Sequence, residues 1–371
     1  MKILPSLLVL LISLISGAFA ETRVSFDQKG EMPALVEKLK TSGKTASPAV
    51  AKPAEAAVNP GFCIFNGKSG EPLADEAAFR ALVKDADAVF TGESHDQLKD
   101  HLAQLEALRA LAAARGGKIV VGFEMLNMTL QPVLDEYAAG KLTEEEFLAK
   151  ADWKNEWGFD FNLYKPIFDF IRANKLRALA LNLPRKVVST IARVGLDGLS
   201  PEQKQYLPAK VEITKNEAYI KYIRDSFENH GKARFAGEKA FLRQYILGKE
   251  NKGMGGFTFE NYLAAMSAWN EAMGARLADF LNANPGFAGQ VVAGAGHVIY
   301  NAGIPASVGS RTSGLSPVSF YPQDAAACPA ALPAADAGLA DLVWYIDHSA
   351  AARKNWNAEV TLRSAYETEH R

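Results

Sequence analysis

Short apolar runs alternate with helix-forming stretches through most of this sequence. The runs have the length and the β-branched content of strands, and they are Ala86–Thr91, Lys118–Phe123, Leu176–Leu181 and Gln290–Ala293. Strands separated by helices pair in parallel, and the helices then cover both faces of the sheet. The sequence therefore predicts an α/β fold with a mostly parallel central sheet. Further helical patterns at Glu212–Gly231, Glu238–Leu247 and Glu260–Asn282 predict a large helical insertion.

Polar side chains with binding or catalytic potential come after each of these four runs. In chain order they are Glu93 and His95, then Glu124, then Asn182 and Arg185, and finally His297. Ligands of such folds bind beyond the carboxyl ends of the parallel strands. Because those ends meet at one edge of the sheet, we expect these side chains to surround a single pocket.

Two of the strand ends have the same form, Gly92-x-x-His95 and Gly294-x-x-His297. Asp96 is the expected N-cap of the next helix, so His95 is not needed to cap that helix and has no evident structural role. Glu124 ends an apolar run, so its carboxylate either takes part in function or forms an ion pair with Arg185. His101 is either a site residue or a buried histidine whose hydrogen bonds are satisfied.

Aromatic residues cluster after the second run, and most of them suit the core of a helical layer. Trp157 lies among charged neighbours and is a candidate wall for a planar ligand. Tyr164 and Tyr300 are candidate phenolate ligands of iron, although a buried tyrosine more often donates a single hydrogen bond and does nothing else.

The 371 residues carry a net charge of −1, which offers no electrostatic footprint for nucleic acid. Residues 1–20 read as a signal peptide, with an apolar segment too short to span a bilayer and Ala18-Phe19-Ala20 as cleavage site. No lipid-anchor cysteine comes after it, so we expect a periplasmic or secreted protein without a transmembrane span. The expected organisation is then a flexible leader at 21–60, an α/β domain at 61–347 and a C-terminal tail at 348–371.

The sequence has two cysteines, Cys63 and Cys328. In an oxidising compartment such a pair predicts a disulfide, which could contribute on the order of 4–5 kcal/mol by closing so long a loop. The alternative is two buried thiols.

Several of these motifs together resemble the ChaN-like proteins of bacterial haem uptake, one arm of the superfamily that includes the Tiki proteases and the erythromycin esterases. The resemblance covers roughly residues 62–347. The segments that carry it are Phe90–Asp96 with His101, Gly122–Met125, Trp157 to Pro166, Asn182–Arg185 and Gly294–His297 leading to Gly303-Ile304-Pro305.

The resemblance implies an exported protein that binds haem in haem or iron uptake, in some members as a homodimer enclosing haem, with an outer-membrane haem receptor as a candidate partner. Iron would be ligated by His95, His297 or a tyrosine, while Arg185 would pair with a propionate. The enzymatic relatives imply an alternative, a metal-dependent hydrolase. In that case His95, His297 and Glu124 would hold zinc or manganese, and Glu93 would act as general base. A third interpretation is a binding or assembly component with a vestigial pocket.

Overall fold

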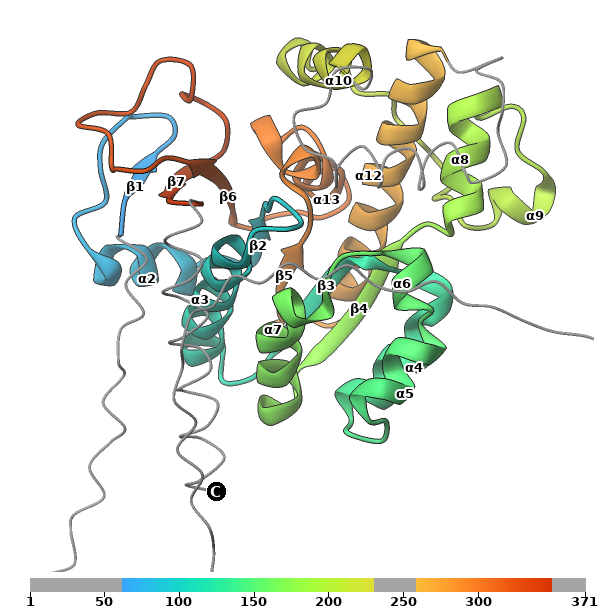
Figure 1. Cartoon of the computed structure of the whole chain (residues 1–371), viewed down its shortest axis with the longest axis horizontal. Coiled ribbons are helices and arrows are strands. Elements are labelled where there is room, and N and C mark those ends of the chain that lie inside the picture. Colours follow the sequence, from blue (N-terminus) through green and yellow to red (C-terminus); the bar gives the residue numbers. More distant parts are fainter. Residues whose placement is uncertain (1–61, 230–257, 349–371) are drawn as a thin grey trace, which may run out of the picture. The chain divides into compact units, whose positions relative to one another are not determined.

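The computed structural model describes residues 62–229 and 258–348 (Figure 1). The expected signal peptide and leader, the expected helix Glu238–Leu247 and the tail beyond residue 348 lie outside the described residues. Within the described ranges, no helix is both long and apolar enough to cross a membrane.

In the described part of the chain, seven strands form one mixed sheet in the order β1-β7-β6-β2-β5-β3-β4. The strands are β1 (Ile64–Asn66), β2 (Ala88–Thr91), β3 (Ile119–Asn127), β4 (Arg177–Asn182), β5 (Ala288–Val292), β6 (Pro317–Asp324) and β7 (Leu342–Ile346). Neighbouring strands are parallel, except that β1 runs antiparallel to β7. The predicted α/β fold with a mostly parallel sheet is confirmed.

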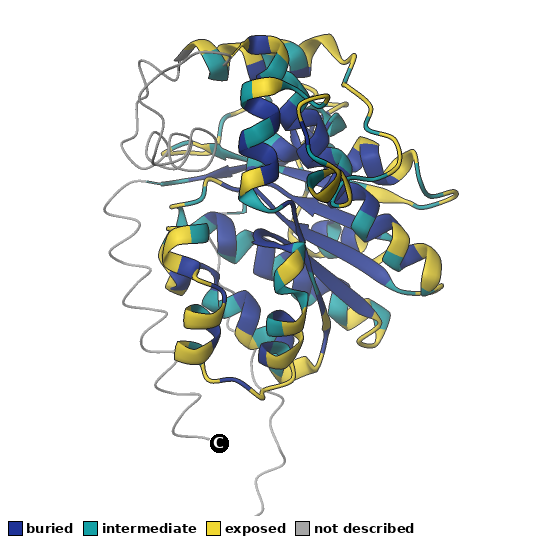
Figure 2. Cartoon of the chain, turned by 90° about the vertical axis from the view of Figure 1, so that its right-hand side faces the viewer, coloured by how far each residue is buried: buried dark blue, intermediate teal, exposed yellow. Residues whose placement is uncertain are grey.

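Helices cover both faces of the sheet (Figure 2). One face carries α2 (Glu76–Lys84), α3 (Leu98–Arg115), α4 (Gln131–Ala138), α5 (Glu144–Lys150), α6 (Trp153–Glu156) and α7 (Phe161–Asn174). The other face carries α8 (Arg185–Val194), α10 (Glu217–Asn229), α12 (Phe259–Ala283) and α13 (Ile304–Gly309), and the short α9 (Pro201–Lys204) comes after α8. Three 3₁₀ turns complete the described elements: η1 (Met128–Leu130), η3 (Ala295–His297) and η4 (Ile299–Asn301).

Successive side chains of the central strands enter opposite layers of the core. In β2, Val89 packs with the α2–α7 layer, while Ala88 and Phe90 pack with the α8–α13 layer. In β3, Val121 joins the first layer and Val120 the second. Because both faces are buried, these strands need apolar residues at every position, which is why they appear in the sequence as continuous runs.

The start of α3 differs from the sequence prediction. Asp96 is not its N-cap, since the helix begins at Leu98 and the capping position is Gln97. A tight turn precedes the helix, in which the Gln97 N–H donates to the Ser94 carbonyl at 2.9 Å. The Asp96 carboxylate accepts instead from the Gln97 side chain at 2.8 Å.

Strand β3 also runs further than predicted, so Glu124 lies within it rather than beyond its end. Pairing with β5 stops where Phe123 faces Val292, while pairing with β4 resumes at Asn127 after a register shift. Such an irregularity re-aims the side chains of the bulged strand. Glu124 therefore lies beside the segment that comes after β5.

A disulfide joins Cys63, just before β1, to Cys328, just after β6, with 5.7 Å between their Cα atoms. The predicted disulfide is confirmed. It links the antiparallel edge strand to the loop that leads from β6 to β7, because β1, β7 and β6 are neighbours in the sheet.

Candidate functional site

The two Gly-x-x-His turns lie side by side at the carboxyl edge of the sheet. Strands β2 and β5 are neighbours, and the pairing continues beyond them, because the Ala295 N–H donates to the Glu93 carbonyl at 2.9 Å. The His95 ring packs directly on Gly294, where a Cβ atom would lie only 2.6 Å from His95 Cε1. Gly294 is therefore required by this close approach.

Glu93 is buried at the centre of a polar cluster. Its Oε1 atom is 2.7 Å from His95 Nδ1 and accepts a hydrogen bond from the Tyr164 hydroxyl at 3.0 Å. Its Oε2 atom is 2.8 Å from His101 Nδ1, a charge contact outside ideal hydrogen-bond alignment. Burial by itself would raise the pKa of Glu93, but the charges and hydrogen bonds of His101 and His95 outweigh it and hold the pKa far below 4.5.

His101 is surrounded by oxygen acceptors. Its Nδ1 atom faces Glu93 and, at 3.2 Å, the Gln104 side-chain oxygen, while Nε2 is 3.3 Å from the His95 carbonyl. The Gln104 amide nitrogen donates to the Thr91 carbonyl, which fixes the Gln104 oxygen toward His101. Both ring nitrogens therefore act as donors, as in an imidazolium. Burial would lower the pKa of His101, but the Glu93 carboxylate raises it above 6.5.

The Glu93–His101 pair predicts how stability depends on pH. Glu93, with its lowered pKa, stabilises the fold fully above about pH 4.5 and less as the pH falls. His101, with its raised pKa, contributes fully below about pH 6.5 and loses its contribution as the pH rises through its folded pKa. Denaturant titration of Glu93→Gln should therefore show a free energy of unfolding that is lower than that of the wild type by roughly 3–5 kcal/mol, because the buried charge of His101 loses its partner.

The same variant should also show a weaker decline of stability between pH 6.5 and 9 than the wild type, because His101 has lost the carboxylate that raised its pKa. An unchanged free energy and an unchanged slope would contradict the ion pair.

His95 is the partly open member of the cluster, with 18% of its side chain exposed. The ring centroids of Trp157 and Phe159 lie 4.8 and 5.0 Å from its own. Glu93 holds Nδ1, and Nε2 points toward Gly294, near Glu124. A histidine oriented by a carboxylate in this way is typical of metal-ligating and general-base histidines.

Glu124 and His297 form a second pair beside the first. Glu124 Oε2 accepts the Gly294 N–H at 2.6 Å, and Oε1 lies 3.3 Å from His297 Nε2, a contact that is attractive when Nε2 carries a proton. Within the described residues Oε1 accepts no hydrogen bond. Burial would raise the pKa of Glu124, but His297 and His95 lower it.

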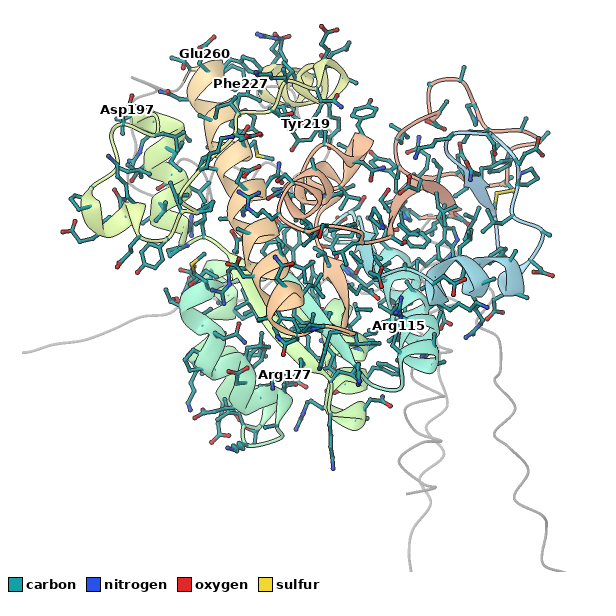
Figure 3. All side chains as sticks on the ribbon, turned by 180° about the vertical axis from the view of Figure 1, so that it is seen from behind. Arg115, Arg177, Asp197, Tyr219, Phe227 and Glu260 are labelled. Carbon is teal, nitrogen blue, oxygen red and sulfur yellow. A yellow bond between two sulfur atoms is a disulfide. The ribbon has the colours of Figure 1, made fainter. Side chains whose placement is uncertain are left out.

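The residues that orient His297 were not predicted from the sequence. Asn270 of α12 accepts from His297 Nδ1 at 2.7 Å and donates at 2.8 Å to the hydroxyl of Tyr219, which donates to the Gly296 carbonyl at 2.9 Å. Figure 3 shows Tyr219 on α10, at the opposite end of the molecule from Arg177, which starts β4. The sequence carries no distinct signal for Asn270, because Ser267 and Glu271 are polar positions of the same stretch of helix.

Asn182 and Arg185 lie at the same edge of the sheet but form different contacts. Asn182 is buried at the end of β4 and donates to the Glu124 backbone carbonyl at 2.6 Å, so it supports the bulge. Arg185, the first residue of α8, donates to the Asn155 carbonyl at 3.1 Å. Burial raises the pKa of Glu156, and the nearby Arg185 charge opposes that rise. These contacts place Arg185 against α6.

The two candidate tyrosines differ in position. Tyr164 is buried, and its hydroxyl is bonded to Glu93; burial, together with the Glu93 charge, raises the pKa of the phenol well above 10. In this geometry Tyr164 orients Glu93. Tyr300 donates its N–H to the Leu339 carbonyl and lies near Lys221 of α10. None of the described contacts of Tyr300 is with the histidines of the site.

The three predicted metal ligands, His95, His297 and Glu124, are brought together at this edge. Nonetheless, residues 62–229 and 258–348 contain no group of three or more histidine, cysteine or carboxylate side chains arranged to hold a metal ion. The predicted zinc or manganese site is therefore not found in the described structure.

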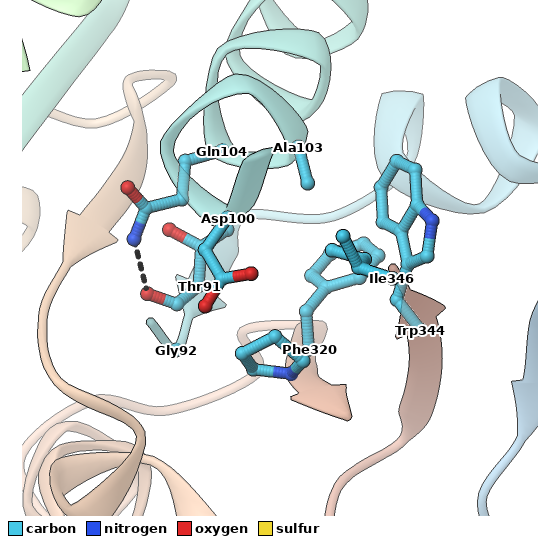
Figure 4. Close-up of a pocket in the computed structure, with 9 residues that line it drawn as sticks. Thr91, Gly92, Asp100, Ala103, Gln104, Phe320, Trp344 and Ile346 are labelled. Carbon is cyan, nitrogen blue, oxygen red and sulfur yellow. Dashed lines mark hydrogen bonds between the residues drawn. The ribbon is translucent and has the colours of Figure 1, made fainter. Parts of the chain in front are cut away.

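A small pocket lies between β2, the first turns of α3 and the β6–β7 pair (Figure 4). Its lining includes Gly92, Asp100, Gln104, Phe320 and Trp344, and it has space for about one water molecule. It is far too small to hold a porphyrin.

The sequence pattern that defines the haem-binding uptake proteins of the Tiki superfamily, ChaN, matches residues 80–308. The chain belongs to this family. The matched segment extends from α2 to α13 and contains every residue of the cluster around Glu93, Glu124 and the two Gly-x-x-His turns.

A solved structure shows the same fold at low sequence identity. The structure entitled "Cofacial heme binding to ChaN of Campylobacter jejuni" is 16% identical, covers 77% of this chain and 97% of its own, and has a TM-score of 0.55. An erythromycin esterase mutant in its open conformation is 14% identical, covering 71% of this chain and 77% of its own, with a TM-score of 0.37. No curated protein is significantly similar to this chain. The ChaN structure supports the shared fold, and the esterase similarity is too weak to support an argument.

Proposed function

We propose that this protein binds haem in haem or iron uptake, with the carboxyl edge of the sheet as its binding site. The observation that carries the proposal is His95, a partly exposed imidazole held by the buried Glu93 carboxylate in a chain of the haem-binding ChaN family. Carboxylate-held histidines are the usual form of an imidazole metal ligand.

The surroundings of His95 suit a haem. Trp157 and Phe159 lie on its flanks and supply apolar ring surface. On the other side the ring packs on Gly294, and Glu124 Oε1 is a buried acceptor without a hydrogen bond among the described residues. When bound, the iron would supply the Lewis-acid centre that His95 ligates. The protein would orient this histidine through Glu93 and shield it with the two aromatic rings.

Titration of the purified protein with hemin tests the proposal. We expect a shifted Soret band that saturates at a fixed stoichiometry, because a ligated haem differs spectroscopically from free hemin. A parallel titration of bovine albumin serves as the reference for non-specific hemin binding. Titrations at two protein concentrations separate specific binding from hemin aggregation. A titration with no shift and no saturation would overturn the proposal.

We further propose that the protein works outside the cytoplasm, in the periplasm or after secretion. The signal-peptide pattern of residues 1–20 supports export, and the Cys63–Cys328 disulfide suits an oxidising compartment. The protein would form a homodimer that encloses haem. Its proposed partner is an outer-membrane haem receptor. Light scattering with and without hemin tests the dimer, and fractionation of cells producing the full chain tests the location.

A second candidate function is hydrolysis, which the Glu93–His95 pair favours. Both Glu93 oxygens are engaged by His95, His101 and Tyr164, so Glu93 would orient His95, and His95 would act as the base. This differs from the expected role of Glu93 as the base. Turnover of an ester or peptide panel, lost in His95→Ala, together with stoichiometric metal by elemental analysis, would support a metal-dependent hydrolase. No turnover across the panel would overturn it.

A further inference from the structure

The end of β7 reaches back to the loop that carries His95. His348 lies two residues beyond β7, and its Nε2 atom is 2.7 Å from Asp100 Oδ1 on the first turn of α3. The other oxygen of the same carboxylate, Oδ2, accepts the Ser94 N–H at 2.8 Å. Ser94 is the residue between Glu93 and His95. One carboxylate therefore joins His348 to the backbone of the Gly92-x-x-His95 turn.

Other contacts make this junction a defined part of the fold. Lys99 donates to the Asp347 carbonyl at 2.8 Å, and the His348 N–H donates to Asp324 at 3.1 Å. Asp100 is only 1% exposed, and it also lines the small pocket beside Gly92 (Figure 4). A carboxylate buried to this degree needs a cation and hydrogen-bond donors, and His348 and the Ser94 amide supply them.

We propose that His348 is a positioning residue for the site: through Asp100 it fixes the Ser94 amide and thereby the turn that aims His95. His348 and its second carboxylate neighbour, Asp324, lie outside residues 80–308, the segment that matches the family pattern. In the sequence it is the first residue of the expected tail. The hemin-binding readout of this role rests on the proposed function, whereas the exchange and titration readouts do not.

The junction should respond to pH. Burial would lower the pKa of His348, but the hydrogen bond to Asp100 and the charges of Asp100 and Asp324 outweigh it and raise the pKa above 6.5, with Lys99 acting in the opposite direction. A base with a raised folded pKa contributes fully below its ordinary value and loses that contribution as the pH rises through the folded pKa. The Ser94 turn should therefore loosen on the alkaline side.

Amide hydrogen exchange measures the turn directly. In His348→Ala we expect the protection factor of the Ser94 amide to fall at least about tenfold, and its decline between pH 6.5 and 9 to disappear. His348→Gln keeps a donor for Asp100 without the charge, so it should restore much of the protection at neutral pH but not the pH dependence. Unchanged Ser94 protection in His348→Ala would overturn the proposal.

Tyr345→Phe is the matched control. Tyr345 lies on the same strand, and its hydroxyl bonds Asp336 at 2.6 Å, away from α3. It should leave Ser94 protection unchanged, and an equal loss in both variants would overturn a specific role for His348.

The link to His95 needs its own readout. We expect His348→Ala to shift the NMR titration of the His95 imidazole and to weaken hemin binding several-fold, with both changes reduced in His348→Gln. If the wild type fails to bind hemin, the proposed function fails, and the Ser94 exchange and the His95 titration together decide the positioning role. Altered Ser94 protection with an unchanged His95 titration would overturn that role.

Discussion

Replacing His95 by alanine should lower the affinity for hemin by at least about a hundredfold and abolish the ligand-dependent shift of the Soret band. The expectation rests on the position of His95, which combines partial exposure, aromatic flanks and a carboxylate on Nδ1. Removing a partner that merely orients a metal ligand typically costs 10–100-fold, so removing the ligand should cost at least as much. Glu93→Gln should accordingly fall within that 10–100-fold range.

Two further variants sharpen this experiment. Gly294→Ala leaves His95 in place chemically but puts a methyl group where the ring lies, 2.6 Å from Cε1, so it should displace the ring and weaken hemin binding. His370 lies outside the matched family segment, so the control variant His370→Ala should bind hemin as the wild type does. Circular dichroism and thermal melts confirm that each variant is folded. Wild-type affinity in both His95→Ala and Gly294→Ala would exclude His95 as the ligand.

Removing the disulfide should cause the largest loss of stability. The bond between Cys63 and Cys328 closes a loop across a sequence separation of 265 residues. In the chain-entropy account a loop of that length contributes on the order of 5 kcal/mol, less any strain. Cys63→Ser with Cys328→Ser should therefore shift the denaturant midpoint strongly downward, and dithiothreitol should do the same to the wild type. The double variant should not respond to dithiothreitol.

The disulfide lies beside the edge strand β1, away from the central strands β2 and β5, which separates the two predictions. It fixes β1 and the loop after β6, whereas the histidines come after β2 and β5. Below its lower melting temperature, the double serine variant should still bind hemin with nearly wild-type affinity. A midpoint equal to the wild type would mean that the native contacts of β1 with β7 suffice without the covalent bond.

The sequence by itself predicted the α/β class, because strands buried on both faces must be apolar throughout and are therefore visible as runs. It also predicted which residues gather at one edge, since parallel strands end on the same side and the residues just beyond each end can be counted off. Glu93, His95, Asn182 and His297 lie at or just beyond strand ends as expected, whereas Glu124 reaches the same edge from within β3. The disulfide pairing was predictable because only two cysteines are present.

The tertiary structure decided the role of each group. Periodicity cannot show that Glu93 is enclosed by His95 and His101, because that contact depends on how α3 packs on β2. Nor can it show that Asn270 orients His297, since that contact requires α12 to pack beside the turn after β5.

The bulge that places Glu124 depends on two different neighbouring strands, and the contact of His348 with Asp100 joins residues 248 positions apart. Local pattern determines the strands and the residues at their ends, whereas hydrogen-bond partners between distant elements arise only when the chain has packed.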